Sequence, residues 1–313
     1  MKKKILITGG AGYIGSKLAT KLIKIGYEVT VIDALKFSSK SLNHLFSEKN
    51  FHFIKGDVRN KVLIKKLIGE NEFIIPLAAL VGAPLCKKNK SEAISVNLNS
   101  IKYLTKVASK KRKKIIYLTT NSGYGVGEKN KYCDETSPLR PISLYGKTKV
   151  ESEKIVMKYK NSIAFRLATV FGYSYRMRTD LLVNNFVYTA LKDKKLTLYE
   201  PHFRRNYIHV NDVVDAIIYS INNFNKLKSN VYNLGLSSAN LTKYMLAKKI
   251  KNQLKQTKIK IVKNKKDPDQ RDYFVSNKKI EKKGFKAKIN VEDGIKELIK
   301  VFSHSNERIV NNY

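Results

Sequence analysis

Apolar and polar positions alternate along the first half of the chain in two different periods. Short apolar runs, typical of buried strands, are separated by longer segments in which apolar residues recur as on one face of a helix. The runs predict strands at 4–8, 28–33, 51–55, 72–76, 114–120 and 163–168, and the longer segments predict helices at 13–25, 60–69, 91–109 and 143–160. Strands and helices that alternate in this way predict an α/β fold with a doubly wound parallel sheet.

The pattern becomes looser after about residue 170. It predicts helices at 181–192, 212–223 and 291–302 and short strands at 207–210 and 231–234. No low-complexity linker and no repeat separates this part from the first half. We therefore expect a first domain at 1–170 and a smaller lobe at 171–313, with elements near 205–235 returning to the first domain.

A glycine-rich turn follows the first predicted strand. Gly9, Gly12 and Gly15 stand at regular spacing and open a helix. In a dinucleotide site, such glycines permit a tight turn, let the backbone approach the pyrophosphate, and let the helix pack on the strand. The helix N-terminus then offers N–H groups to the phosphates. Asp33 ends the next strand, close to the offset of ~20 residues at which a carboxylate binds the adenosine ribose. Together these features predict a Rossmann domain.

The acid at the end of the second strand also bears on the choice of cofactor. A carboxylate at Asp33 would repel the 2′-phosphate of NADP, and no arginine follows it closely in the sequence. NAD is therefore the expected cofactor. Lys36 and Lys40 weaken this argument, so an NADPH-dependent reductase stays open.

The chain is strongly basic, with 62 lysines and arginines against 25 acids and a formal net charge of +37. A nucleic-acid binder would gather these cations on one face with aromatic residues between them. Here lysines are spread over nearly every segment. We interpret the charge as a lysine-rich surface, expect no specific nucleic-acid partner, and note that the charge suits an anionic small-molecule substrate.

The remaining composition argues against several other classes of protein. Cys86 and Cys133 form no CxxC motif and the histidines are scattered, so neither a metal site nor a disulfide framework is expected. No apolar run approaches the ~18–20 residues of a membrane span. The apolar stretch after the N-terminal lysines is too short for a signal peptide. We expect a cytoplasmic protein without a membrane partner.

A tyrosine and a lysine lie one helical turn apart in the predicted helix 143–160. Tyr145 and Lys149 share one face of that helix. A phenol has a pKa near 10 in water, and a lysine ammonium one turn away favours the phenolate. Upstream, Thr120 ends a predicted strand, where its hydroxyl can reach the same substrate oxygen. A dinucleotide turn, a strand-end hydroxyl and this helix, in this order, indicate redox chemistry on an alcohol.

These residues make the chain resemble the extended short-chain dehydrogenase/reductases that act on nucleotide sugars, over essentially its whole length. The segment 8–15 resembles the TGGxGxIG motif of that family, and Gly56-Asp57-Val58-Arg59 resembles its adenine-contacting element. The resemblance implies that NAD is bound by Gly9, Gly12, Tyr13, Ile14, Gly15, Asp33, Asp57, Val58, Leu77, Ala78, Ala79, Asn97, Tyr145 and Lys149. It also implies that Thr120, Tyr145 and Lys149 are the catalytic residues.

The resemblance extends into the second lobe. The segment 205–212 resembles one whose arginine contacts the substrate diphosphate, and 270–276 resembles a later segment with another nucleotide-facing arginine. The implied partner is a nucleotide-diphosphate sugar, bound by Val81, Thr120, Asn184, Asn185, Arg205 and Arg271. The resemblance also implies a homodimer that packs through the helices at 91–109 and 143–160.

Members of this family share their first step, in which tyrosine takes a proton from a sugar hydroxyl, usually at C4, while hydride passes to NAD. An epimerase then returns the hydride to the other face of the ketone. A 4,6-dehydratase must also remove the C5 proton and protonate the C6 hydroxyl, which relatives do with an Asp-Glu pair directly after the threonine. Asn121 and Ser122 stand there in this chain, and an amide cannot serve as that acid. We therefore predict a C4 epimerase.

Other functions remain open alternatives. A dehydratase could recruit its acid from another loop, at Glu128, Asp134 or Glu135. A 4-keto reductase would use the same catalytic residues. Some relatives are non-enzymatic dinucleotide sensors, although those tend to lose the catalytic tyrosine or lysine. No motif identifies the nucleotide base or the sugar.

Overall fold

The computed structural model of the chain describes residues 2–37, 40–128, 131–262 and 271–304. Its centre is a seven-stranded sheet with the order β11-β7-β5-β4-β1-β2-β3, in which every neighbouring pair is parallel. The strands are β1 (Lys4–Thr8), β2 (Glu28–Asp33), β3 (Phe51–Lys55), β4 (Phe73–Pro76), β5 (Lys114–Thr120), β7 (Ser162–Leu167) and β11 (Asn230–Leu234). The predicted doubly wound α/β fold is confirmed.

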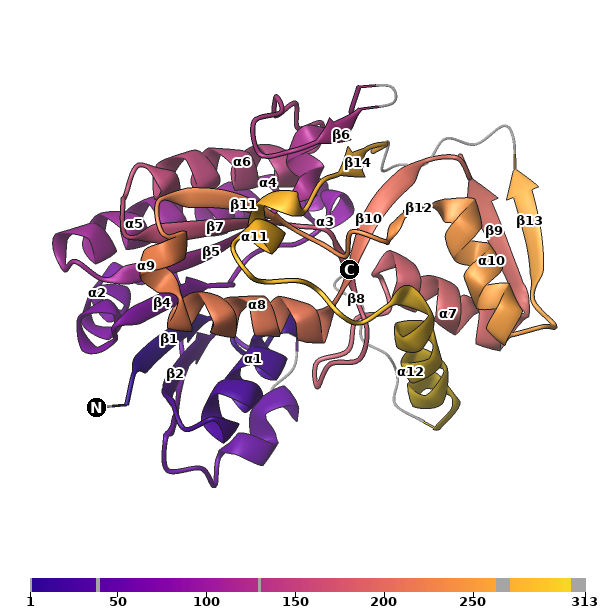
Figure 1. Cartoon of the computed structure of the whole chain (residues 1–313). Coiled ribbons are helices and arrows are strands. Elements are labelled where there is room, and N and C mark those ends of the chain that lie inside the picture. Colours follow the sequence, from indigo (N-terminus) through magenta and orange to yellow (C-terminus); the bar gives the residue numbers. More distant parts are fainter. Residues whose placement is uncertain (1, 38–39, 129–130, 263–270, 305–313) are drawn as a thin grey trace.

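Helices cover both faces of this sheet because alternate strand residues point in opposite directions. In β1, Ile5 belongs to the core beneath α1 (Tyr13–Lys24) and α8 (Val210–Asn222). Leu6 belongs to the core beneath α2 (Lys61–Glu70), α5 (Ser100–Lys110) and α6 (Leu144–Met157). Figure 1 shows these two helical layers on opposite sides of the sheet.

The later part of the chain builds the second lobe, which lies on the right in Figure 1. A three-stranded sheet has the order β12-β10-β8, and β9 pairs in parallel with β13. The strands are β8 (Thr169–Phe171), β9 (Lys195–Tyr199), β10 (Arg204–His209), β12 (Asn240–Thr242) and β13 (Lys258–Val262). The helices α7 (Leu182–Asp193), α10 (Lys243–Gln253) and α12 (Val291–His304) pack against one another beside them.

Short elements complete the described part of the chain. They are the 3-10 helices η1 (Lys40–Leu45) and η3 (Asn121–Tyr124), the helices α3 (Ala83–Lys88), α9 (Phe224–Leu227) and α11 (Lys278–Lys282), and the strand pair β6 (Tyr132–Cys133) and β14 (Phe274–Val275). None of the helices within the described ranges has both the length and the apolar character that a membrane crossing requires.

The predicted elements of the first half are confirmed, with one difference in geometry. The helix expected at 91–109 is built from α4 (Lys90–Ile94), a π-helical turn η2 (Ser95–Asn99) and α5. Such turns often mark functional positions. In the second half the sequence pattern missed α10 and the strands β8, β9, β12 and β13.

Candidate active site

A cavity of about 1140 Å³ lies between the sheet and the second lobe. Its floor is formed by residues at the carboxyl ends of β1, β2, β4 and β5. The strand order reverses between β1 and β4, and α/β sheets bind their ligands at such a switch point. The volume exceeds the ~300–1,000 Å³ of a usual small-molecule pocket, which suits two ligands side by side.

At Gly9 and Gly15, the turn after β1 is packed too closely on neighbouring backbone to accept a side chain. Gly9 has a φ of 72°, and a Cβ there would lie 2.5 Å from the Ala78 nitrogen. A Cβ at Gly15 would lie 2.5 Å from the Gly9 oxygen. The helix α1 begins after Gly12, and no side chain caps its N-terminus. Its first N–H groups are therefore available to an anion, as the diphosphate of NAD requires.

Asp33 ends β2 at the edge of the same cavity. Its Oδ2 accepts a hydrogen bond from the Ala11 nitrogen at 3.0 Å, and its Oδ1 accepts one from the Leu35 nitrogen at 2.8 Å. Burial raises the pKa of Asp33, and these two backbone bonds act against that rise. A carboxylate offers about four acceptor positions, so oriented acceptor capacity remains for ribose hydroxyls.

The cavity brings together most of the residues that the sequence assigned to the cofactor. Its lining includes Gly9, Gly12, Tyr13, Ile14, Gly15, Asp33, Asp57, Val58, Leu77, Ala78, Ala79, Tyr145 and Lys149. The residues present therefore fit NAD: a turn without side chains, an uncapped helix N-terminus and a strand-end carboxylate follow one another along the cavity.

Asn97 has a different place from the one expected. Its buried side chain accepts a hydrogen bond from the Leu80 nitrogen at 2.8 Å and donates one to the Leu80 oxygen at 2.9 Å. Its own carbonyl accepts from the Ser152 hydroxyl at 2.7 Å. Asn97 is not among the lining residues. It holds the segment 77–81 against α6 from behind, so its action on the cavity is indirect.

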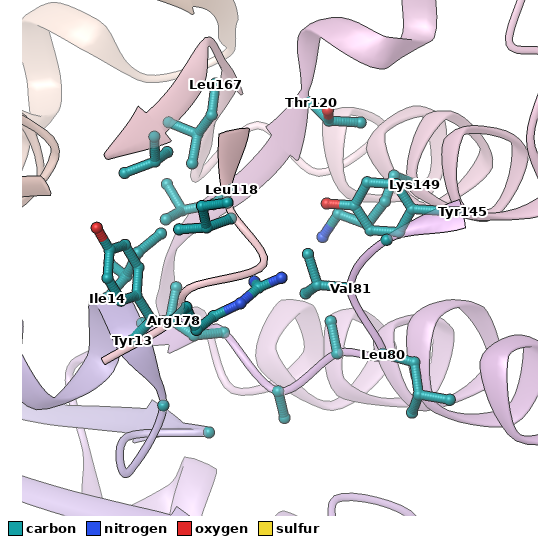
Figure 2. A pocket seen from close by; sticks show the side chains of 18 of the residues that line it. Tyr13, Ile14, Leu80, Val81, Leu118, Thr120, Tyr145, Lys149, Leu167 and Arg178 are labelled. Carbon is teal, nitrogen blue, oxygen red and sulfur yellow. The ribbon is translucent and has the colours of Figure 1, made fainter. Parts of the chain in front are cut away.

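The three predicted catalytic residues converge on one side of the cavity. Thr120 ends β5, and Ser143 caps α6 by accepting from the Gly146 nitrogen at 3.1 Å. The helix therefore begins just before Tyr145. Figure 2 shows the Tyr145 hydroxyl and the Lys149 ammonium pointing side by side into the cavity, with Thr120 nearby.

Burial is the largest influence on the pKa of Tyr145 and on the pKa of Lys149. It raises the pKa of Tyr145 to about 12, and the charge of Arg178 is the largest influence in the opposite direction. Burial also lowers the pKa of Lys149 to about 7, while Glu153 acts against this. The Lys149 ammonium lies 4.2 Å from the centre of the Tyr117 ring. The sequence assigned the support of the phenolate to Lys149, whereas the structure adds Arg178 to it.

The predicted substrate residues fall into two groups. Val81, Thr120, Asn185, Arg205 and Arg271 line the cavity. Asn184 does not: its buried amide accepts from the Gly172 nitrogen at 3.0 Å and donates to the Arg178 oxygen at 2.8 Å. This amide fixes the loop before α7, which explains why it does not line the cavity.

Arg271 is joined to Thr120 through a serine. Arg205 donates to the Arg271 carbonyl at 2.8 Å, and the Arg271 guanidinium donates to the Ser122 hydroxyl. Ser122 in turn accepts from the Thr120 hydroxyl at 2.9 Å. A cation, rather than a carboxylate, is therefore the charged group joined to Thr120 through hydrogen bonds.

Each carboxylate that lines the cavity already accepts hydrogen bonds from groups of the protein. In the part of the chain that the structure describes, the lining contains Asp33, Asp57 and Asp180. Asp57 pairs with Arg59 at 2.6 Å, and Asp180 pairs with Arg178. The acids that the sequence left open for a dehydratase lie outside the lining. Glu128 pairs with Lys131 at 2.7 Å, Glu135 accepts from the Asn233 nitrogen at 2.6 Å, and Asp134 accepts from the Thr136 hydroxyl at 2.7 Å.

Other lining residues were not assigned to the site from the sequence. Arg176 and Arg178 enter from the loop between β8 and α7, and Phe37 follows Lys36 after β2. The signal for the two arginines was their closeness in one short loop. Within the described ranges, no group of His, Cys, Asp and Glu side chains could hold a metal ion.

Comparison with known proteins places this geometry in context. The sequence model of the NAD dependent epimerase/dehydratase family matches residues 5–235. Over 97% of its length, the chain is 29% identical to a trifunctional UDP-glucose 4,6-dehydratase/UDP-4-keto-6-deoxy-D-glucose 3,5-epimerase/UDP-4-keto-L-rhamnose-reductase from Arabidopsis thaliana. It covers 48% of that protein, and so spans about half the length of the first curated relatives it matches.

Solved structures show the same fold. The dTDP-glucose 4,6-dehydratase of Bacillus anthracis, in complex with NAD, is 25% identical with a TM-score of 0.85, and the match covers 98% of each chain. The UDP-glucose 4-epimerase of Thermotoga maritima, with UDP-glucose, is 24% identical with a TM-score of 0.85 over 97% of this chain and 100% of the other. Likeness to structures therefore does not separate the two reactions.

Proposed function

The chain belongs to the NAD dependent epimerase/dehydratase family, and we propose that it is an NAD-dependent epimerase of a nucleotide-diphosphate sugar, acting at C4 through a transient keto-sugar. The observation that carries this proposal is the surroundings of Thr120. Within the described ranges, the hydrogen bonds of Thr120 lead through Ser122 to the guanidinium of Arg271. The carboxylates that line the cavity already accept hydrogen bonds from the protein, so none is assigned as the acid of a dehydration.

The chain's own residues supply the proton chemistry. Tyr145 takes the proton of the C4 hydroxyl, and Thr120 holds the oxygen as the ketone forms. Bound NAD would supply the acceptor and donor for the C4 hydride, and its oxidised ring would add a positive charge. Together with Lys149 and Arg178, such a charge brings the pKa of Tyr145 down from the raised value of the free protein. After the sugar has turned over, Tyr145 gives the proton back.

We expect substrate binding to depend on two arginines and on the free volume of the cavity. Arg205 and Arg271 line the cavity beyond Thr120 and are expected to hold the diphosphate of the sugar nucleotide. An epimerase needs no second acid or base, but the keto-sugar must have room to present its other face. We also propose that the protein is a homodimer that packs through the outer faces of α5 and α6.

A dehydratase is the second candidate, because the Bacillus anthracis and Arabidopsis thaliana proteins both carry that name. A glucose deuterated at C4, linked in turn to UDP, dTDP, GDP and CDP, separates the two reactions. An epimerase keeps the label at C4 in its product, and the C5 proton does not exchange in D₂O. A dehydratase moves the label to C6 and takes up solvent deuterium at C5, an outcome that would refute our proposal. Tyr145→Phe serves as the inactive control.

A further inference from the structure

The loop 172–180, which joins β8 to α7, lies across the first turn of α1. The Tyr13 hydroxyl donates to the Gly172 oxygen at 2.6 Å, and the Ser174 hydroxyl donates to the Tyr13 oxygen at 2.6 Å. The hydroxyls of Ser174 and Ser16 lie 3.1 Å apart. The loop is therefore attached to the same helix end that faces the diphosphate of the cofactor.

Arg176 extends from this loop into the cofactor half of the cavity. It is 5% exposed, and its guanidinium carbon lies 4.7 Å from the centre of the Phe37 ring. Phe37 follows Asp33, the acid that faces the adenosine ribose. This cation–π contact favours a guanidinium that stays beside the Phe37 ring before a ligand arrives.

The charges around Arg176 define its place along the cofactor. Burial lowers its pKa to about 10, Arg178 lowers it further, and Asp180 and Asp33 act in the opposite direction. Arg176 therefore lies close enough to both Asp33 and Arg178 for their charges to act on it. Figure 2 shows Arg178 pointing toward the side of the cavity that holds Tyr145. A dinucleotide with its ribose at Asp33 and its reactive ring at Tyr145 has its diphosphate between these points.

We infer that Arg176 binds the diphosphate of NAD, and that the loop 172–180 holds the cofactor together with the N-terminus of α1. The planar guanidinium can donate to two phosphate oxygens at once. The second lobe then contacts the cofactor as well as the sugar nucleotide. Cofactor would stay bound through many turnovers, whichever reaction the enzyme performs.

Binding measurements on purified protein freed of nucleotide test this inference without reference to activity. We expect Arg176→Gln to weaken NAD binding by about 10- to 100-fold in calorimetry, the range for a lost charge-assisted hydrogen bond. Arg176→Lys should recover only part of this loss, because a lysine ammonium lacks the planar pair of N–H donors with which a guanidinium binds two phosphate oxygens. Arg112→Gln removes the same charge from an exposed position and is the control. UDP and dTDP binding, measured on each variant, should stay unchanged.

Two results would overturn the inference. NAD affinity of Arg176→Gln equal to that of Arg112→Gln removes the proposed contact. A loss confined to UDP and dTDP assigns the arginine to the diphosphate of the sugar nucleotide instead. Thermal melting without ligand shows whether each variant folds. If Arg176→Gln does not fold, Phe37→Leu decides: it leaves the guanidinium in place but removes the stacking, and an unchanged affinity for NAD contradicts the inference.

Discussion

At the scale of single residues, the cavity combines a phenol with an unusually high pKa and an ammonium with an unusually low one. Burial causes both shifts, because a low-dielectric surrounding disfavours the charged form of each group. In the free protein near neutral pH, Tyr145 is therefore protonated and Lys149 is only partly charged. Ligand binding must change this balance before proton transfer begins, which ties the chemical step to an occupied site.

The lowered pKa of Lys149 predicts a specific dependence of stability on pH. In the unfolded chain a lysine has a pKa near 10.4, against about 7 in the folded protein. Between these values the unfolded state binds more protons, so the folded state gains stability as the pH rises. Below pH 7 the cost of burying the charge is present in full. Lys149→Met removes it, so its free energy of unfolding should exceed that of wild type most at pH 6.

Urea unfolding of both proteins at pH 6, 7, 8 and 9 measures this difference. The advantage of Lys149→Met should shrink steadily from pH 7 upward, while Lys147→Met, at an exposed position on the same helix, should track wild type throughout. A constant difference between Lys149→Met and wild type over this range would show that Lys149 titrates normally in the folded protein.

The sequence predicted those site residues whose spacing is local. Tyr145 and Lys149 lie one turn apart on a helix, and Thr120 ends a strand, so backbone periodicity alone places them. It could not place Arg176 beside Phe37, because that contact joins distant segments through the second lobe. For Asn97 and Asn184 the residue type was informative, but which way an amide points depends on the packing around it.

At the scale of elements, the π-helical turn before α5 connects the helix layer to the cavity. Within it, Asn97 satisfies both backbone groups of Leu80, a residue of the segment beside the cofactor. The Cys86 thiol also donates to the Leu80 oxygen, at 3.3 Å, so Asn97→Ala would leave only the buried Leu80 N–H without a partner, at ~1–3 kcal/mol. We therefore expect a loss of about 1–3 kcal/mol in the free energy of unfolding, together with weaker NAD binding.

Denaturant unfolding and calorimetry check this expectation. Asn99→Ala, at an exposed position of the same turn, is the matched control and should change neither quantity. If both variants are equally stable, the hydrogen bonds to Leu80 do not hold the segment in place.

Elements of the second lobe were harder to predict than those of the sheet. The strands β8 and β12 are only 3 residues long, too short for a periodic signal. The helix α10 carries lysines at several positions, which hides its apolar face in the sequence. Such segments take their structure from the neighbours they pack on, and these neighbours are remote in the chain.

At the scale of the whole molecule, the positive charge bears on the proposed dimer. The helices α5 and α6 carry the exposed residues Lys102, Lys106, Lys110, Lys147 and Lys154. Among the residues of these two helices, Glu151 is the exposed acid. Two copies packed through the outer face of these helices would bring like charges together, and the repulsion would act against the apolar contacts of the interface.

The dimer should therefore depend on salt in the direction opposite to an ion-paired complex. Screening extends over ~30 Å at 0.01 M salt and ~3 Å at 1 M. In sedimentation velocity experiments we expect mainly monomer near 0.01 M salt and dimer near 0.5 M.

Lys106→Glu should shift association to lower salt, because it replaces a repulsion by an attraction. Lys251→Glu, on the exposed side of α10, makes the same change in net charge away from this face. An equal shift in both variants would assign the effect to net charge, and a monomer at every salt concentration would refute the dimer itself.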